Sequence, residues 1–431
     1  MKYSNLDILS INRILFSSTE GRGSLGKQLL VYFGQLFFYT FLHRFKYKGI
    51  PKGYKGILFV GFSKNNQRSL APIIQNMQDG EYISLENHMD DVNKRKAWWI
   101  SFPYIFTLIR TYRKSDAQTR QCIKRYFVDF WTTYGLYHIA EEYLIRYKVS
   151  TLVVSNDHNT IQRCLILRAK EKGSKTIYVQ HASVTAKFPR LLFDYSFLDG
   201  EETLEKYLCA GQPEGYIVLS GGVRFDSFHK KTRSAQIPSI KTIGVAINMV
   251  DDFEQVKKLC LHLLNCNYRI VLRPHPRYGA VNQDWLKENE IMFSNPITEN
   301  SSEFIDNIDC MISNQSAIHL DAAIMNCPCI MFNFSNKNIN DYYSFIKNGL
   351  VKEAHNYDEL DSLLATPDQL LPSGSVLQYY NASSNTPLQG HLGEIIATCI
   401  NTVNNDKCIE LNPNNYFRKD ENRAHVFTIK K

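Results

Sequence analysis

A histidine enclosed by two prolines is the most distinctive chemical feature of the sequence, in the run Arg273-Pro-His-Pro-Arg277. The prolines fix the backbone on both sides of His275, so its imidazole is held in one place. A fixed imidazole suits a phosphate oxygen, and the guanidinium of Arg273 could add two parallel hydrogen bonds. A rigid loop with a satisfied surface histidine is the competing interpretation. On the first interpretation, Arg273, His275 and Pro276 bind the phosphate of a nucleotide donor.

A second phosphate-binding candidate is the polar run Ser313-Asn-Gln-Ser316, which follows a short apolar stretch. The pattern predicts a strand, a turn and then a helix whose first N–H groups can bind an anion. We expect Ser313, Asn314 and Ser316 to contact the donor phosphate, and Asp321 to accept a hydrogen bond from a ribose hydroxyl. Plain N-capping by one of the serines explains the run equally well. Asn248, which follows another apolar run, completes the donor-side candidates.

Three groups in the first half of the chain could act as a general base on an acceptor hydroxyl: Asp157, His181 and Asp199. Each follows a short apolar run at the point where a strand is expected to end, and His158 stands beside the first of them. An ordinary Asp-Gly turn competes with the catalytic interpretation of Asp199. A buried structural histidine competes with that of His181. The sequence leaves the choice of base open.

These candidates need a scaffold that gathers strand ends, and the chain repeatedly alternates a short β-branched run with a helical run. That alternation predicts parallel α/β sheets, whose ligands bind beyond the carboxyl ends of the strands. The strands expected in the first half lie at 56–62, 151–155, 176–180, 191–197 and 216–220, with a helix over 160–172. Those expected in the second half lie at 242–248, 268–272, 291–293, 310–313 and 329–334, with helices near 252–265, 316–326 and 357–365.

The predicted fold class is therefore α/β, with two Rossmann-like parallel-sheet domains that face each other across a cleft. We expect an acceptor-side domain over residues 1–235 and a nucleotide-donor-binding domain over 236–385. A closing helix and tail follow over 386–431, with the helix crossing back to the first domain and the polar residues after Asn404 forming a loose tail. The 431 residues are enough to bury two cores.

The ten cysteines are scattered, mostly within apolar runs, which fits a reducing cytoplasm better than a disulfide framework. Cys327 and Cys329 resemble half of a metal site, but no second pair or nearby histidine completes four zinc ligands. We therefore expect no metal and no cofactor.

The net charge of +8 is concentrated in the first third of the chain, where basic residues flank aromatic ones. Segments 24–48 and 94–126 both show this mixture, which suits the headgroup level of an anionic membrane. The first segment is interrupted by Gln35 and is too short to span a bilayer, which needs about 20 apolar residues. Amphipathic helices packed on the first sheet explain the same features. No nucleic-acid-binding motif accompanies the charge, so we expect no nucleic-acid partner.

Taken in order, the motifs resemble those of bacterial surface-polysaccharide transferases, over about residues 150–365. The segments that carry the resemblance are Val179-Gln-His-Ala182, Phe193-Asp-Tyr-Ser-Phe-Leu-Asp-Gly200, Ser220-Gly-Gly-Val-Arg-Phe-Asp226, Arg273-Pro-His-Pro276 and Ser313-Asn-Gln-Ser316. The families in question are the capsule Kdo transferases, the bacterial sialyl- and polysialyltransferases, and the CDP-glycerol glycerophosphotransferases. They share the two-domain GT-B fold, which the resemblance implies for this chain.

The resemblance also implies roles for particular residues. His275, Pro276, Ser313 and Ser316 would hold the donor phosphate of a cytidine nucleotide. Asp199 matches one acid of the acidic pair that serves as base in the sialyltransferases, although Leu198 replaces the other acid. His181 matches the histidine of the glycerophosphotransferases, although Ala182 replaces the glycine after it. Inversion by direct displacement follows, without a metal, and the absence of any Asp-x-Asp sequence agrees with that.

The sequence thus predicts an inverting glycosyltransferase of capsule, lipopolysaccharide or other surface-glycan synthesis. Its expected partners are a nucleotide-activated donor (CMP-Kdo, CMP-sialic acid or a CDP-alditol) and a glycan or glycolipid acceptor. Its expected place is the cytoplasm, with peripheral contact to the inner face of the plasma membrane. The alternatives are a UDP-sugar transferase, a UDP-sugar 2-epimerase, and an inactive GT-B protein that serves as an assembly partner.

Overall fold

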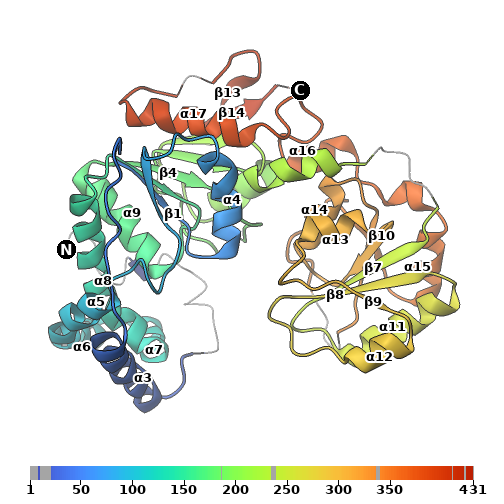
Figure 1. The fold of residues 1–431 in the computed structure, drawn as a ribbon, viewed down its shortest axis with the longest axis horizontal. Helices are drawn as coiled ribbons and strands as arrows, with labels where there is room; N and C mark the ends of the chain where they lie inside the picture. The colour runs from blue at the N-terminus through green and yellow to red at the C-terminus, as the bar shows by residue number, and fades with distance from the viewer. Residues whose placement is uncertain are drawn as a thin grey trace. The chain divides into compact units, whose positions relative to one another are not determined.

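The computed structural model describes residues 8–9, 21–185, 187–233, 239–335, 340–409, 411–421 and 424–430. The chain forms two compact units (Figure 1). Unit 1 consists of Met1–Arg224 and His391–Lys431, and unit 2 of Phe225–Gly390. The domain boundary expected at residue 235 lies outside the described residues.

Unit 1 contains an 8-stranded sheet in the order β13-β14-β6-β5-β4-β3-β1-β2. Its strands are parallel except for the β13–β14 pair, which is antiparallel. All four residues of β1, β3 and β5 are buried, which explains why the strands appear in the sequence as continuous apolar runs. The strand bounds are β1 (Ile57–Val60), β2 (Tyr82–Leu85), β3 (Thr151–Val154), β4 (Lys175–Val179), β5 (Tyr195–Leu198), β6 (Tyr216–Leu219), β13 (Tyr416–Glu421) and β14 (Ala424–Ile429).

The strand-to-helix connections of unit 1 place polar groups at the carboxyl ends of the strands. Helix α9 (Thr160–Lys172) follows β3 and ends at Gly173, whose φ of 77° is left-handed and therefore favours glycine. Helix α10 (Glu201–Leu208) follows β5 directly. The predicted helix 160–172 is confirmed, so the segment 156–159 is a connection at the strand end.

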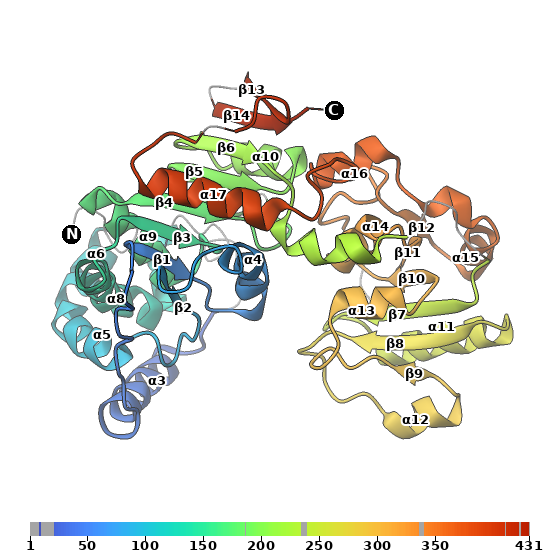
Figure 2. The same ribbon diagram turned by 45° about the horizontal axis from the view of Figure 1, so that its top comes forward.

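The C-terminal segment completes unit 1. Helix α17 (Leu392–Asn404) contacts β3 and β4 and packs on α4 (Lys64–Ile74), as Figure 2 shows. The expectation of a loose tail after Asn404 is wrong, because β13 and β14 form a hairpin and β14 pairs in parallel with β6. Val426 and Ile429 are buried there. The backbone hydrogen bonds of β14 go to β6, and the polar sequence of the tail does not indicate this partner.

Helices gather at the amino-terminal side of unit 1 around α8 (Phe127–Arg146), which contacts α3, α5, α6 and α7 (Figure 1). Ser101 Oγ accepts a hydrogen bond from the N–H of Gly135, and a Cβ on Gly135 would lie 1.8 Å from the carbonyl oxygen of Ala97. The described helices include none with both the length and the apolar character needed to cross a bilayer. Their bounds are α3 (Leu25–Phe37), η1 (Phe38–Leu42), α5 (Lys94–Ser101), η2 (Phe102–Tyr104), α6 (Ile105–Lys114) and α7 (Ala117–Arg125).

Unit 2 contains a 6-stranded parallel sheet in the order β12-β11-β10-β7-β8-β9. Apolar cores cover both of its faces, one under α11 and α15 and the other under α13, α14 and α16. The strands are β7 (Thr242–Ile247), β8 (Arg269–Pro274), β9 (Met292–Phe293), β10 (Cys310–Ser313), β11 (Cys329–Phe332) and β12 (Lys352–Ala354). The helices are η3 (Val223–Lys231), α11 (Phe253–Asn265), α12 (Gln283–Glu288), α13 (Ser301–Asp306), α14 (Ile318–Ile324), α15 (Tyr357–Leu364), η4 (Pro367–Leu370) and α16 (Gly374–Tyr380). The predicted α/β class with two parallel-sheet units is confirmed.

Candidate functional site

The three predicted bases of unit 1 follow three adjacent strands. Asp157 comes after β3, His181 after β4 and Asp199 after β5. Because these strands are parallel and neighbouring, their carboxyl ends meet at one edge of the sheet. Two contacts join the ends: the rings of His158 and His181 are 6.0 Å apart, and the N–H of Asp199 donates to Gln180 Oε1 at 2.8 Å.

Asp157 orients His158. Its buried carboxylate lies 3.0 Å from His158 Nδ1 through one oxygen, and accepts a hydrogen bond of 3.0 Å from the Tyr207 hydroxyl through the other. The Tyr207 and Tyr178 hydroxyls are themselves hydrogen-bonded at 3.0 Å. Burial raises the pKa of both tyrosines well above the usual value, so both hydroxyls keep their protons. The Asp157 carboxylate therefore joins the end of β3 to α10 and holds the His158 ring.

His181 is held as a neutral imidazole. Loss of water around the ring, followed by the neighbouring His158, lowers the pKa of His181 to about 4. Its Nδ1 atom has no hydrogen-bond partner in the part of the chain that the structure describes. An uncharged histidine keeps a nitrogen lone pair at neutral pH and can accept a proton from a hydroxyl.

Asp199 forms a buried ion pair with Arg224. The guanidinium contacts both carboxylate oxygens, at 3.0 and 2.5 Å, and the two side chains are only 3% and 10% exposed. The guanidinium thus occupies both carboxylate oxygens, so the role of base predicted from the sequence would require this ion pair to open. The ion pair joins the end of β5 to the segment after β6.

In unit 2, the predicted residues Asn248 and Asn314 lie within one hydrogen-bond network at the strand ends. The side chain of Asn248, after β7, donates to the carbonyl oxygen of Gln315, after β10, at 2.7 Å. The Asn314 amide donates to Asp251 Oδ1 at 2.8 Å and to Asn333 Oδ1, beyond β11, at 3.3 Å. The ends of three neighbouring strands are thereby joined.

His275 stands at the end of β8, beside this network. Its backbone N–H donates to the carbonyl oxygen of Ile247 at 2.8 Å, one residue before Asn248. Its Nδ1 accepts from the backbone N–H of Arg277 at 3.1 Å, so the ring proton of the neutral form belongs on Nε2. Loss of water, followed by the charge of Arg277, lowers the pKa of His275. His275 is partly exposed and Pro276 exposed, which leaves an uncharged N–H donor at the strand end.

Two other predicted donor-binding side chains point into the unit. Arg273 lies on β8 itself and is buried, donating to Ser294 Oγ at 2.6 Å and to the carbonyl oxygen of Glu299 at 2.8 Å. Ser313 is also buried and donates to the carbonyl oxygen of Ala246 at 2.7 Å. Both therefore tie neighbouring segments together, because β10 and all of β8 after its first residue are buried.

Helix α14 begins at Ile318, two residues later than the start predicted near residue 316. Ala317 is the N-cap of α14 and makes no side-chain capping bond, while Ser316 Oγ is 3.5 Å from the N–H of Ile318. Ser316 and Asp321 are partly exposed. The N-capping explanation of the serines is thus weakly supported at Ser316 and not at Ser313.

Sequence reasoning missed several residues that hold these groups in place. Arg224 was quoted only as part of a motif, and Tyr207 and Asp251 were not singled out. Nothing in the sequence signals these pairings, because the partners are distant in the chain and Tyr207 lies in α10. His319 of α14 is fully buried, with its Nε2 atom 3.0 Å from the carbonyl oxygen of Asn314. Among the contacts of the predicted bases, the one between Asp157 and His158 could be expected from the sequence, because the two residues are adjacent.

Comparison with solved structures identifies the fold of the chain. The structure resembles that of a UDP-N-acetylglucosamine 2-epimerase, with a TM-score of 0.52 and 11% identity over 83% of this chain and 98% of that chain. It also resembles the wall teichoic acid polymerase TagF, with a TM-score of 0.50 and 13% identity over 88% of this chain and 98% of that chain. The chain has the GT-B fold. No protein-family model matches the sequence, and no curated protein is significantly similar to it.

The GT-B fold confirms the architecture that the motif order implied. At 11% and 13% identity, these neighbours establish the fold alone. The two strand-end clusters must therefore carry the argument about function.

Proposed function

We propose that this GT-B chain is an inverting glycosyltransferase of bacterial surface-glycan synthesis that uses a cytidine-nucleotide donor. The observation that carries the proposal is the strand-end cluster of unit 2, in which the neutral His275 stands beside Asn248 and Asn314, two residues joined through Asp251. Ligands of parallel α/β sheets bind at such strand ends. The cytidine base is proposed from the ordered motifs, of which His275-Pro276 and Ser313–Ser316 are the donor-side part.

On the donor side, we assign phosphate binding to His275 and Ser316. The Nε2–H of His275 would donate to a phosphate oxygen, and the Ser316 hydroxyl would add a second hydrogen bond. Asp321 remains the proposed partner of a ribose hydroxyl. These contacts stabilise the charge that builds on the nucleotide as the bond from the sugar to the phosphate breaks.

On the acceptor side, we assign the general base to His181. Its neutral imidazole would take the proton of the acceptor hydroxyl as that oxygen forms the new bond to the anomeric carbon. Asp157, acting through His158, and Asp199, paired with Arg224, would fix the surrounding strand ends. The single displacement inverts the anomeric centre, and the nucleotide leaves through an unprotonated phosphate oxygen that takes the electron pair of the broken bond.

We also propose that unit 1 touches an anionic membrane, where a lipid-linked acceptor would lie. Large apolar side chains on α3 and η1 are exposed to solvent: Leu30 is 76% exposed, Phe37 59% and Phe41 71%. Lys27 before them and Arg44 after them are exposed too. Apolar side chains with cations at both ends suit the headgroup boundary of a negatively charged bilayer.

A UDP-sugar 2-epimerase is the second candidate, and the similarity to a UDP-N-acetylglucosamine 2-epimerase favours it. An epimerase would convert a nucleotide sugar without any acceptor. An inactive assembly partner would bind glycan or protein without turning over a donor.

The deciding experiment is thermal stabilisation of the protein by CMP, CDP, UDP, GDP and ADP, compared between the wild type and His275→Ala. A ligand that binds the folded state raises the apparent Tm by mass action. Selective stabilisation by a cytidine nucleotide, lost in His275→Ala, is the expected result. His355→Ala is the control, because His355 is a histidine of the same unit whose side chain is 68% exposed and which lies between β12 and α15.

Other outcomes redirect the proposal. A preference for UDP would replace the cytidine donor with a hexose transferase or the epimerase, and incubation with UDP-N-acetylglucosamine alone would separate those two. No response to any nucleotide would favour the inactive partner. Equal losses in His275→Ala and His355→Ala would remove His275 from the donor site.

A further inference from the structure

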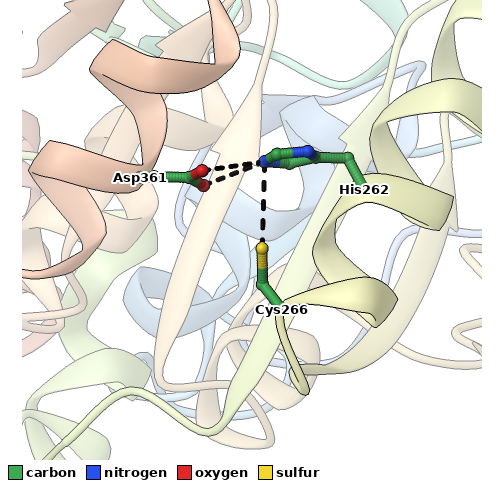
Figure 3. A group of neighbouring side chains, drawn as sticks. All are labelled: His262, Cys266 and Asp361. Atoms are coloured by element: carbon green, nitrogen blue, oxygen red, sulfur yellow. Dashed lines mark hydrogen bonds and ion pairs between the residues drawn. The ribbon is translucent and has the colours of Figure 1, made fainter.

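Unit 2 carries a second group of chemically capable side chains that the proposed transfer reaction does not use: His262, Cys266 and Asp361 (Figure 3). The Nε2 atom of His262 lies 2.9 and 3.2 Å from the two carboxylate oxygens of Asp361. The Cys266 sulfur lies 4.0 Å from the same nitrogen. One ligand atom from each residue falls within 4.8 Å of the others.

The backbone brings these ligands together without strain. His262 lies in the last turn of α11 and Cys266 is its C-cap residue, so the two stand one above the other on one helix face. Asp361 comes from α15, which packs with α11 on the same apolar core through Leu259, Leu263 and Leu360. The position of the site is therefore set by the packing of two helices.

Aromatic stacking fixes the direction of the imidazole. The ring of His262 stacks on Tyr357 with centroids 4.3 Å apart and an interplanar angle of 17°, and Tyr357 stacks in turn on Phe332 of β11. Nε2 therefore stays turned toward Asp361 and Cys266, as Figure 3 shows. A nitrogen that is already aimed at two further ligands loses little conformational freedom on binding an ion.

The group lies at the amino end of β8, whereas the proposed donor site lies at its carboxyl end. Cys266 ends α11 just before β8 begins at Arg269, whereas His275 follows the carboxyl end of β8. Strand β8 itself separates the two places. Ions held here cannot touch a nucleotide bound at His275.

We propose that His262, Cys266 and Asp361 bind one divalent ion of the zinc class, with solvent as the fourth ligand. Nitrogen, thiolate and carboxylate donors are the set that zinc takes, and tetrahedral ligand atoms lie about 3.3–3.8 Å apart, which the present spacings approach. On binding, the thiol proton goes to solvent. His262 moves its ring proton from Nε2 to Nδ1, so that the metal replaces the proton now shared with Asp361. The ion would fasten α11 to α15.

The test is titration of the tag-free full chain with cobalt(II), which reports thiolate ligation by absorbance. One cobalt per chain, with sulfur-to-cobalt charge-transfer and tetrahedral d–d bands that zinc abolishes, is the expected result. Cys266→Ser should remove the charge-transfer band, and Asp361→Asn should weaken cobalt affinity at least tenfold. Zinc should raise the Tm of the wild type by several degrees and leave Cys266→Ser unchanged.

Matched controls come from the same chain. Cys209 and Cys408 are also exposed thiols, so Cys408→Ser should bind cobalt as the wild type does. His355 lies 3.8 Å from Glu353 and outside the proposed metal site, so His355→Asn should do the same. Bands that survive Cys266→Ser, or cobalt that binds only with octahedral, weakly absorbing spectra, would overturn the proposal. So would a wild-type protein that binds no cobalt. Circular dichroism of each variant shows whether it is folded.

Discussion

Arg224 and Asp199 show how one residue can change the interpretation of another. From the sequence, an aspartate at the end of a strand before glycine is a candidate base. In the folded chain its two oxygens face a guanidinium that approaches from the segment after β6. The carboxylate is thereby committed to holding two strand ends together. His181, which has no charged partner in the ion pairs of the described residues, is the base that we propose.

Removing Arg224 should therefore be more harmful than removing both members of the pair. We expect Arg224→Met to lower the free energy of unfolding of unit 1 by about 3–5 kcal/mol, because Asp199 would remain buried and charged without its partner. The double variant Asp199→Asn/Arg224→Gln should lose much less. Urea denaturation of the three proteins measures this difference. If the double variant is as unstable as the single one, the ion pair is not what the Arg224 substitution disrupts.

The same double variant also tests the choice of base. If Asp199 only positions β5, transferase activity should survive in Asp199→Asn/Arg224→Gln but fall at least a hundredfold in His181→Asn, which is the scale of a lost general base. The reverse pattern would return Asp199 to the role that the sequence suggested.

His319 makes a pH-dependent contribution to the stability of unit 2. Burial lowers the pKa of His319 to about 4, while in the unfolded chain it is near 6.5. As the pH falls from 7 toward 4, the unfolded state gains a proton that the folded state resists, so stability decreases. The loss from this residue is about 3 kcal/mol. His319→Gln should flatten the fall in unfolding free energy between pH 7 and 4.5, whereas His355→Gln should leave it unchanged.

At the scale of elements, α3 and η1 expose apolar side chains that a soluble helix would normally bury. Their buried side is already used, since Tyr32 stacks on Trp131 of α8 at 3.9 Å between ring centroids. The outward side carries Leu30, Phe37 and Phe41. Segment 24–48 thus has one packed face and one exposed apolar face, and the exposed face is the one that we propose contacts the membrane.

We expect the triple substitution Leu30→Ser/Phe37→Ser/Phe41→Ser to reduce binding to vesicles that contain phosphatidylglycerol by roughly tenfold or more, because each side chain loses the free energy of apolar burial in lipid. Sedimentation with these vesicles measures it. Ile145→Ser on α8 is the control, since Ile145 is 61% exposed but lies away from α3. Unchanged sedimentation of the triple variant would refute the membrane contact of α3.

For the molecule as a whole, an element was predictable from the sequence where its own residues determine it, and was missed where it depends on a distant partner. Strands such as Thr151–Val154 are buried on both faces, so their apolar runs are visible without any partner. Helix α9 carries its own stop at Gly173. Strand β14, in contrast, is a strand because β6 offers an edge to it, and no local pattern announces that edge. The parallel α/β class was therefore predictable and the C-terminal hairpin was not.

The candidate sites divide in the same way. Residues that follow strands were found because strand ends are a rule of the fold, and His181, Asn248, His275 and Asn314 do stand there. Which way a side chain points was not predictable, since Arg273 and Ser313 lie on the strands themselves and turn inward. Pairings between strand ends, such as Asp199 with Arg224, depend on the sheet order.

The division into units leads to a last prediction, about folding in isolation. Unit 2 is one continuous segment with an apolar core on each face of its sheet, and it contains the whole proposed donor cluster. We expect a fragment of residues 225–390 to unfold cooperatively and to show the same nucleotide preference as the full chain.

The corresponding fragment of unit 1, residues 1–224, should fail to fold stably. It lacks α17, whose Gly393 approaches Pro72 of α4 so closely that a Cβ would lie 2.5 Å from the proline carbonyl oxygen. It also leaves β6 as an unpaired edge where β14 belongs, and exposed edges favour aggregation. Joining residues 391–431 to residues 1–224 through a short flexible linker should restore a soluble, cooperative unit, which circular dichroism and thermal denaturation would detect. A stable 1–224 fragment would mean that unit 1 does not need the C-terminal segment in order to fold.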